Sequence, residues 1–484
     1  MLSPLHRLGV PYAVLAPALT LGCRALDRAC RATARESPMS QKKLKVISLF
    51  SGGMGLDLGL KETDRYELLA CVEKVPAYCE TIRLNRDAGR LPSNMKLYEG
   101  DITNVDPHDV MAATGIKPGE LDVLVGGPPC QSFSTAGNRG TVQDPRGTLL
   151  WQFLKFVEVL QPKFFLMENV RGLISAALRH RPIAERPPKG PELSVEEMPG
   201  SVIRLFSQDL QRLEAKYHLD VFEVNAVNYG APQIRERVLF IGNRFGAQVA
   251  FPDPTHGPVE GLDVEDDLFS TGIKLKGWRS LGDVISDLHE ANPEVMDFSP
   301  RKKSFLEMVP EGSNWRSLPE EIQKESMGKA WLAKGGRSGW WRRLTMDLPC
   351  PTLVTMPNHS STSLCHPVHT RALSVREYAR VQEFPDYWEF AGKTADKYAQ
   401  IGNAVPVRLG KVAGEVIAKC YDELEANGWR PLEQAPEAFR IVYIQSHVRT
   451  RRWFKDGKTI VWDKETDEAD YGKSKTKRLV KALA

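Results

Sequence analysis

The sequence predicts an α/β fold, in which a mostly parallel β-sheet carries helices on both faces. Three observations support this prediction. Short apolar runs, of the kind expected for strands buried on both faces, alternate with helical stretches from Leu44 onward. Turns rich in glycine or proline follow several of these runs. The chain has 484 residues, 42% of them hydrophobic, which is enough for two or three globular units.

The apolar runs place the individual elements in chain order. Strands are expected at residues 46–50, 68–72, 121–125, 164–167 and 238–241, and a helix is expected at residues 77–85. Ligands of such sheets bind in the loops at the carboxyl ends of the strands. The residues that directly follow each strand are therefore the first candidates for function.

Three segments depart from this alternation. Residues 179–199 are rich in proline, arginine and glutamate, and we expect an inserted surface loop there. Residues 245–373 hold five tryptophans among many turn residues, and are expected to form a second, irregular domain. Beyond residue 427, strand-like runs at 439–462 and a basic tail at 473–481 close the chain.

Composition narrows the class of protein. The net charge of +4 does not by itself indicate a nucleic acid partner, although a local basic cleft can still bind phosphate. The eight cysteines show no CxxC pair and no zinc-like spacing, which favours a reducing compartment, free thiols and no metal. No apolar run is long enough to span a bilayer. The apolar residues 8–22 have the character of a weak signal or transit segment, or of an upstream extension before a start at Met39.

The strongest motif is Gly-Pro-Pro-Cys-Gln-Ser-Phe-Ser at residues 127–134, directly after the strand predicted at 121–125. Its two prolines restrict the backbone before Cys130, so that a thiol is held rigidly at the end of a strand. A buried, inert cysteine in a turn is the alternative interpretation.

Two further polar motifs are expected at the same edge of the sheet. Glu168 follows the strand predicted at 164–167, and Arg235 and Arg237 precede the strand predicted at 238–241. Taken separately, each could be ordinary surface polarity. Together with Cys130, they supply a thiol, a carboxylic acid and guanidinium groups in one layer of strand ends.

The order of these motifs resembles that of the DNA (cytosine-5) methyltransferase family. The matching blocks are Phe-Ser-Gly at 50–52, Glu73, Gly-Asp-Ile at 100–102, Pro-Pro-Cys-Gln at 128–131, Glu-Asn-Val at 168–170, Gln-x-Arg-x-Arg at 233–237 and Gly-Asn-Ala-Val-Pro at 402–406. The resemblance runs from Leu44 to about Glu425, apart from a variable region. It implies a Rossmann-like methyltransferase fold that uses S-adenosylmethionine (AdoMet), with a smaller irregular domain that recognises the target.

The resemblance also implies a domain organisation. We expect an unstructured N-terminal extension at 1–42, a catalytic AdoMet-binding domain at 43–244, a target-recognition domain at 245–373, a return to the catalytic domain at 374–426 and a basic C-terminal extension at 427–484.

In the family, catalysis uses a cysteine thiolate that adds to carbon 6 of cytosine, and Cys130 matches that residue. Glu168 matches the acid that binds or protonates ring nitrogen 3. Arg237 matches the arginine that holds the exocyclic oxygen, with Arg235 as a supporting neighbour in the catalytic set. Because the base is stacked in the duplex, it must be flipped into the pocket.

The resemblance places the methyl donor, AdoMet, at the other strand ends. The glycine-rich turn supplies Phe50, Ser51, Gly52, Gly53 and Gly55, and Glu73 matches the acid on the ribose. The adenine-contacting pair and the remaining lining residues are Asp101 and Ile102, then Pro129, Leu149, Asn403 and Ala404. The chain departs from the family at Met54, where glycine is usual, and at Lys74.

The expected partner is double-stranded DNA, bound by a monomer in the bacterial cytoplasm at the nucleoid, with a cognate restriction endonuclease as a candidate partner and no membrane association. Arg337, Arg342 and Arg343 surround the Gly-Trp-Trp stretch at 339–341 and are candidates for reading guanine. Alternatively, the tryptophans are core and the arginines contact phosphate. Two other functions stay open at this point: a transfer RNA cytosine-5 methyltransferase, and a catalytically dead DNA-binding regulator of the same fold.

Overall fold

The computed structural model describes residues 42–129, 148–258, 275–332, 337, 339–436, 439–444 and 478–483, the last segment as backbone. Contacts divide the chain after Lys42, and the description below concerns the unit Lys43–Ala484. Within the described residues, every helix is too short or too polar to cross a bilayer.

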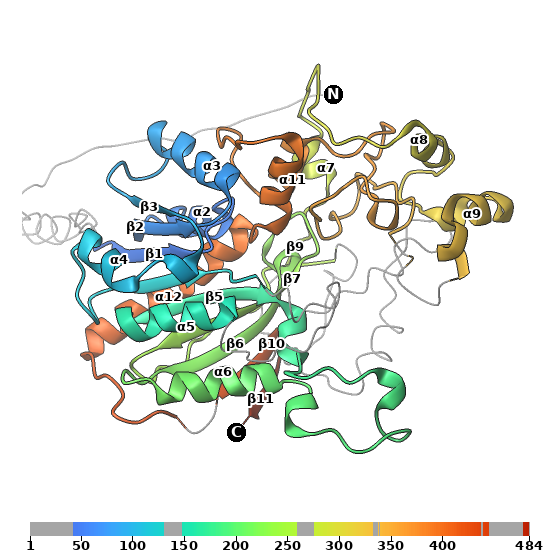
Figure 1. The fold of residues 1–484 in the computed structure, drawn as a ribbon. Coiled ribbons are helices and arrows are strands. Elements are labelled where there is room, and N and C mark those ends of the chain that lie inside the picture. The colour runs from blue at the N-terminus through green and yellow to red at the C-terminus, as the bar shows by residue number, and fades with distance from the viewer. Residues whose placement is uncertain are drawn as a thin grey trace, which may run out of the picture. The chain divides into compact units, whose positions relative to one another are not determined.

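The centre of this unit is one sheet, in the order β11-β10-β6-β7-β5-β4-β1-β2-β3 (Figure 1). Its strands are β1 Leu44–Leu49, β2 Tyr66–Glu73, β3 Lys96–Glu99, β4 Val123–Gly126, β5 Phe164–Val170, β6 His218–Asn225, β7 Glu236–Asn243, β10 Phe439–Ile444 and β11 Arg478–Leu483. Neighbouring strands are parallel except where β7 and β11 pair with their neighbours. The predicted mostly parallel sheet is confirmed.

Helices cover both faces of the sheet (Figure 1). One apolar cluster packs α4 (Pro107–Thr114), α5 (Leu149–Leu160) and α6 (Ser201–Arg212) against one face, and a second packs α2 (Gly55–Lys61) and α12 (Val407–Asn427) against the other. The remaining described α-helices of the predicted catalytic domain (residues 43–244 and 374–426, called the catalytic part below) are α3 Pro76–Asp87, α10 Val375–Val381 and α11 Thr394–Asn403. This two-sided coverage confirms the predicted Rossmann-like fold class.

Two glycines let α2 and α12 approach each other closely. A Cβ atom at Gly59 of α2 would lie 2.3 Å from the carbonyl oxygen of Val407, and one at Gly410 of α12 would lie 2.6 Å from that of Leu56. Such distances are far shorter than carbon–oxygen contacts in packed interiors. The segment that returns late in the chain is therefore held directly against the helix that follows the first turn.

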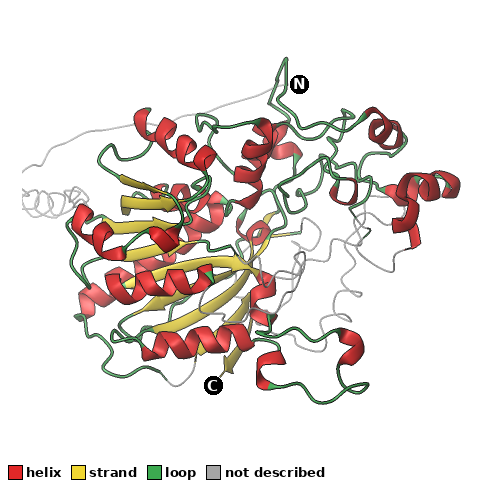
Figure 2. Ribbon diagram, viewed as in Figure 1, coloured by secondary structure: helices red, strands yellow, loops and turns green. Residues whose placement is uncertain are grey.

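The segment predicted to recognise the target, residues 245–373 and called the target segment below, consists mostly of loops (Figure 2). Its described short elements are β8 His256–Gly257, β9 Lys276–Gly277, α7 Gly282–Ile285, α8 Pro300–Glu307 and α9 Glu320–Met327. An apolar cluster around Phe305, Leu306, Trp315 and Trp341 fills its interior. The paucity of ladders means that backbone groups here depend more on side chains for hydrogen bonds.

The segment beyond residue 427 contributes to the main sheet. β10 pairs in parallel with β6, and β11 pairs antiparallel with β10. The Arg440 guanidinium donates to the fully buried Asp220 carboxylate of β6 and, at 2.7 Å, to the carbonyl oxygen of Val249. An ion pair and a ladder thus tie the end of the chain to the edge of the sheet.

Candidate active site

The strand register aligns the ends that carry the motifs. Leu49 of β1 lies opposite Val72 of β2 and Gly126 of β4, and Gly126 lies opposite Met167 of β5. Phe50 and Gly127, which directly follow β1 and β4, therefore lie at the same edge of the sheet as Glu73, the last residue of β2, and Glu168, near the end of β5. The sequence motifs meet because parallel strands end together.

The turn after β1 is built from left-handed backbone. Phe50 has φ 56°, Gly52 has φ 55° and Met54 has φ 69°. Glycine adopts this conformation freely, whereas the two other residues do so at a steric cost. Met54 is fully buried and precedes α2. The position where the family usually has glycine therefore keeps the left-handed backbone and places its side chain in the core.

Gly55 brings the turn against the late-returning segment. A Cβ atom there would lie 2.2 Å from the carbonyl oxygen of Val405 and 3.2 Å from the Cβ atom of Ala404. Only glycine fits so close an approach. The structure thus brings the predicted donor-site residues Gly55 and Ala404 together, although they are distant in the chain.

Glu73 locks the same turn through its carboxylate. Oε2 accepts a hydrogen bond from the backbone N–H of Gly52 at 2.7 Å, and Oε1 accepts from the N–H groups of Lys74 and Val75, each at 2.8 Å. Ser51, between Phe50 and Gly52, is buried. The carboxylate and the glycine turn therefore form one rigid unit at the ends of β1 and β2.

Asp101 occupies the next strand end, after β3. Its Oδ1 accepts from the N–H and the hydroxyl of Thr103 at 3.0 and 2.9 Å, and its Oδ2 accepts from Lys74 Nζ at 2.6 Å. Lys74, followed by the Thr103 hydrogen bonds, lowers the pKa of Asp101 to about 2. The following Ile102 is buried. The structure thus gives a partner to Lys74, whose role the sequence left open.

The late-returning segment adds Asn403 at the end of α11. Asn403 is exposed, and its side chain forms a hydrogen bond with Tyr78 of α3, whose pKa is raised by burial. Sequence reasoning missed Tyr78, because a tyrosine in a helix gives no motif signal. Leu149 begins α5 and is half-buried, and Pro129 is exposed at the last position before the undescribed residues 130–147.

Glu168 and Arg237 form a buried ion pair between β5 and β7. Arg237 Nε lies 2.6 Å from Glu168 Oε1, and each side chain is 11% exposed. Burial lowers the pKa of Arg237, and the neighbouring carboxylate opposes that shift. The antiparallel register places Arg237 opposite Val170, which brings the two charged groups together from distant parts of the sequence.

The proline turn lies against this pair. Asn169 Nδ2 donates to the carbonyl oxygen of Pro128 at 3.0 Å, and a Cβ atom at Gly127 would lie 3.4 Å from Glu168 Oε2. The second carboxylate oxygen therefore faces the turn that leads to Cys130. Cys130 itself lies outside the described residues.

Arg235 is buried and binds backbone carbonyls. Its Nη1 donates to Leu353 O at 3.1 Å, and its Nη2 donates to Gly402 O at 2.8 Å and Ala404 O at 3.0 Å. The missed residue Gln382 also donates to Ala404 O at 2.8 Å, and to Ile401 O at 2.7 Å. These bonds suit Arg235 to positioning the 402–404 turn, whereas its sequence-based assignment was to the catalytic set.

In the target segment, Arg343 uses its hydrogen-bond donors within the protein. It is buried and donates to the carbonyl oxygens of Leu306 at 2.7 Å and Val309 at 2.8 Å, and to the Thr370 hydroxyl at 2.9 Å. The hypothesis that Arg343 reads a guanine is therefore wrong for this structure, because its donors are already used. The neighbouring Trp341 is 2% exposed and belongs to the core, as the alternative interpretation predicted.

Arg337 and Arg342 are also in contact with the protein. Arg337 lies over the Trp315 ring, 5.0 Å from its centre, and burial lowers the pKa of Arg342 to about 10. Neither arginine projects freely from a surface loop in this structure.

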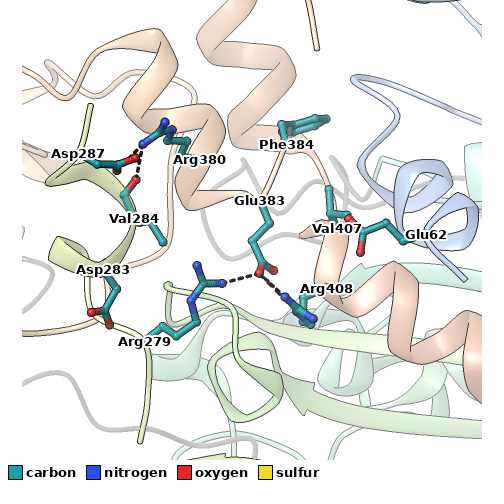
Figure 3. A pocket seen from close by; sticks show the side chains of 10 residues that line it. All are labelled: Glu62, Arg279, Asp283, Val284, Asp287, Arg380, Glu383, Phe384, Val407 and Arg408. Atoms are coloured by element: carbon teal, nitrogen blue, oxygen red, sulfur yellow. Dashed lines mark hydrogen bonds and ion pairs between the residues drawn. The ribbon is translucent and has the colours of Figure 1, made fainter. Parts of the chain in front are cut away.

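A cavity of about 340 Å³ lies between α7, α10 and the start of α12 (Figure 3). At its centre, Glu383 Oε1 accepts from Arg279 Nη1 at 2.9 Å and Arg408 Nη2 at 3.0 Å, joining the target segment to the catalytic part. None of the motif residues lines this cavity. It is therefore distinct from the strand-end layer, which is the candidate active site.

The model of one protein family, described as C-5 cytosine-specific DNA methylase, matches residues 44–419. The chain belongs to the C-5 cytosine-specific DNA methylase family. This match confirms the family predicted from the motif order and identifies the chain as a DNA (cytosine-5) methyltransferase.

Two curated relatives of this methyltransferase align over most of their length. Type II methyltransferase M.Sau96I of Staphylococcus aureus is 36% identical over 375 residues, which cover 77% of this chain and 75% of the relative. Type II methyltransferase M.Eco47II of Escherichia coli is 33% identical over 395 residues, with coverages of 80% and 82%. Among solved structures, a protein encoded within an E. coli prophage shares the fold, with a TM-score of 0.50, 24% identity and coverages of 79% and 100%.

Proposed function

We propose that this methyltransferase transfers the methyl group of AdoMet to carbon 5 of a cytosine flipped out of double-stranded DNA, through a covalent bond between Cys130 and carbon 6. The observation that carries the proposal is the buried Glu168–Arg237 pair beside the proline turn that leads to Cys130. This arrangement offers an acid and a fixed cation to one edge of a planar base.

The cysteines that the structure describes are unsuited to the role of nucleophile. Five of the eight, at positions 71, 79, 350, 365 and 420, are described, and all are buried. Burial raises the pKa of each, for example to about 12 for Cys350 and about 11 for Cys365. Because only the thiolate is nucleophilic, these groups are inert near neutral pH. This supports the assignment of the chemistry to Cys130.

The strand-end residues fit AdoMet by their chemistry. Glu73 and Asp101 are carboxylates at neighbouring strand ends, suited to a ribose hydroxyl and to a purine amino group. A Cβ atom at Gly52 would meet nothing closer than Phe50 O at 3.9 Å, so this side of the turn is open for a ligand. When bound, AdoMet supplies an electrophilic methyl group.

The proposed reaction distributes its steps among three side chains. The Cys130 thiolate forms a bond to carbon 6, and the electron pair displaced from the 5,6 double bond makes carbon 5 nucleophilic. Glu168, which keeps Oε2 towards the turn, hydrogen-bonds or protonates nitrogen 3, while Arg237 holds the exocyclic oxygen and stabilises the charge that develops there. After methylation, which leaves S-adenosylhomocysteine, a water molecule accepts the carbon 5 proton; the electron pair of that carbon–hydrogen bond re-forms the double bond and expels Cys130 as thiolate.

The biological role is proposed from the relatives. Both are named Type II methyltransferases, which favours a modification enzyme that acts on DNA and is paired with a cognate restriction endonuclease. That it acts as a monomer on duplex DNA is part of the proposal. Unstacking the target base costs a few kcal/mol, which contacts to DNA and to the emptied site must offset. A tritiated-methyl assay on duplex DNA and bulk transfer RNA separates this role from RNA methylation and from an inactive regulator. Labelled RNA alone, or no labelled product, would contradict it.

The covalent step is tested with duplex DNA that contains 5-fluorocytosine. Fluorine at carbon 5 cannot leave as a proton does, so the Cys130 adduct should persist and migrate as a protein–DNA complex in denaturing gels. Cys130→Ser should abolish both transfer and trapping, whereas Cys420→Ser, at a buried cysteine of α12, serves as the matched control and should trap normally. Covalent trapping by the Cys130→Ser protein would reject the assignment.

A further inference from the structure

Lys74 reaches across the donor site from the end of β2 to the end of β3. Its backbone N–H is fixed by Glu73 Oε1 at 2.8 Å, and its Nζ donates to Asp101 Oδ2 at 2.6 Å. The lysine side chain is 69% exposed and that of the aspartate 29%, so the pair lies at the open surface of the strand-end layer. Among the described donor-site residues, Lys74 is the one whose side chain brings a positive charge to the Asp101 carboxylate.

The hydrogen bonds that Asp101 already accepts leave little room for another hydrogen-bond donor. A carboxylate offers about four acceptor sites. Thr103 fills Oδ1 with its N–H and its hydroxyl, and Lys74 takes one site on Oδ2. A ligand that donates to Asp101 must therefore share Oδ2 with the ammonium group or displace it.

We propose that Lys74 competes with the purine amino group of the methyl donor for Asp101. The Lys74–Asp101 ion pair, called the latch below, then sets both the affinity for the methyl donor and the selectivity for its purine. The inference rests on the proposed function, which assigns Asp101 to the purine. It makes Lys74 a specificity-determining residue, both through its competition for Asp101 and through its own ammonium group.

The proposal has a second consequence for selectivity. Without Lys74, the Asp101 carboxylate could only accept hydrogen bonds and would therefore favour a 6-amino purine. The Lys74 ammonium only donates, so it suits the carbonyl oxygen of a 6-oxo purine. With both groups at one edge, the site should discriminate weakly between adenine and hypoxanthine.

The latch should be weak, because exposed ion pairs contribute little and are screened by salt. Replacing Lys74 by methionine keeps most of the stem and removes the charge. The dissociation constant of S-adenosylhomocysteine, measured by calorimetry on the full chain without DNA, should fall by up to about fivefold in Lys74→Met. Added salt should tighten binding by the parent protein, because it screens the latch, and should have no such effect on the variant.

Lys43→Met is the matched control. Lys43 forms an ion pair of the same kind, 2.9 Å from Asp64, but it precedes β1 at the opposite end of the strands from the donor site. Its loss changes the net charge equally and should leave donor affinity and its salt dependence unchanged. An equal change in the dissociation constant in both variants would show that the effect comes from net charge alone, and would overturn the proposal.

Two further measurements separate this inference from the proposed function. S-Inosylhomocysteine, which carries a 6-oxo purine, should lose affinity relative to S-adenosylhomocysteine more strongly in Lys74→Met than in the parent. In an Asp101→Asn background, Lys74→Met should leave the affinity for S-adenosylhomocysteine unchanged. If Lys74→Met binds the product equally or more weakly while Glu73→Ala loses binding, the latch is rejected and the donor site stands. If Glu73→Ala and Asp101→Ala both bind normally, the proposed donor site itself is rejected.

Discussion

Arg237 in the strand-end layer and Arg343 in the target segment serve different purposes. At the end of the sheet, the ladders satisfy the backbone, and Arg237 is free to pair with Glu168. In the target segment, ladders are scarce, and Arg343 spends its donors on the carbonyl oxygens of Leu306, Val309 and others. Arg343 shows that an arginine in a loop-rich domain can take the place of missing secondary structure. Its presence there does not by itself indicate a contact to DNA.

The largest expected effect concerns chemistry at the strand ends. Glu168→Gln removes the group that can protonate nitrogen 3, and should lower the methyl transfer rate by about 10²–10⁴-fold. Binding of S-adenosylhomocysteine, measured by calorimetry, should survive and show that the site is still folded. Glu158→Gln, on the exposed face of α5, is the control. A rate within a few-fold of the parent would remove Glu168 from the mechanism.

Arg343→Ala tests the other side of the comparison. The buried carbonyl oxygens around it would lose their charged donor, so the free energy of unfolding should fall by on the order of 3 kcal/mol. Arg343→Lys should not restore it, because an ammonium cannot reproduce the planar set of donors.

Arg337→Ala is the matched variant in the same stretch, and its stacking on Trp315 contributes only about 0.5–1 kcal/mol. Chemical denaturation measures all three proteins. Equal stability of the parent and Arg343→Ala, together with an altered target sequence in bisulfite sequencing, would return Arg343 to the role of base reader.

The third prediction concerns a buried acid beneath the glycine turn. Burial raises the pKa of Asp57 in α2 from 3.8 to about 6. Below about pH 4 the group is protonated in both states, and between about pH 4 and 6 the folded state alone keeps the proton. Stability from this group therefore falls as pH rises, by about 3 kcal/mol in total. Asp57→Asn should be more stable than the parent at pH 8, with a difference that shrinks towards pH 4.

Asp64→Asn should change the pH dependence of stability in the opposite direction. The exposed Asp64 has its pKa lowered by Lys43, so its contribution exists above the unfolded pKa and disappears as pH falls. Thermal unfolding of the two variants over the same pH series should give differences from the parent that run in opposite directions. Parallel curves would show that Asp57 is ionised in the folded protein without penalty.

Most of the sheet was predictable, because apolar runs are a local signal. The strands of this sheet that were missed are β3, β6 and β11. The sequences of β3 and β6, Lys-Leu-Tyr-Glu and His-Leu-Asp-Val-Phe-Glu-Val-Asn, carry polar residues that hide the run, and β11 lies in the segment that was predicted only to be a basic tail. In β6 those polar groups are buried and paired, as Asp220 is with Arg440. A sequence does not show which distant residue will satisfy a buried charge.

The residues of the candidate site likewise divide into those that a local sequence signal predicts and those that depend on distant contacts. Glu168 and Arg237 were predicted because each follows or precedes a recognisable strand. Gln382, Tyr78 and the partner of Lys74 were not, because their roles depend on contacts with segments far along the chain. Arg343 was misjudged for the same reason.

Arg235 fixes a spacing between two parts of the enzyme. Its guanidinium connects the segment that enters β7, where Arg237 stands, to the turn that carries Asn403. Moving the turn away from the strand would stretch two hydrogen bonds to carbonyl oxygens that water cannot easily reach. We therefore expect the protein scaffold to set the spacing between the turn assigned to the methyl donor and the strand assigned to the base before either substrate binds.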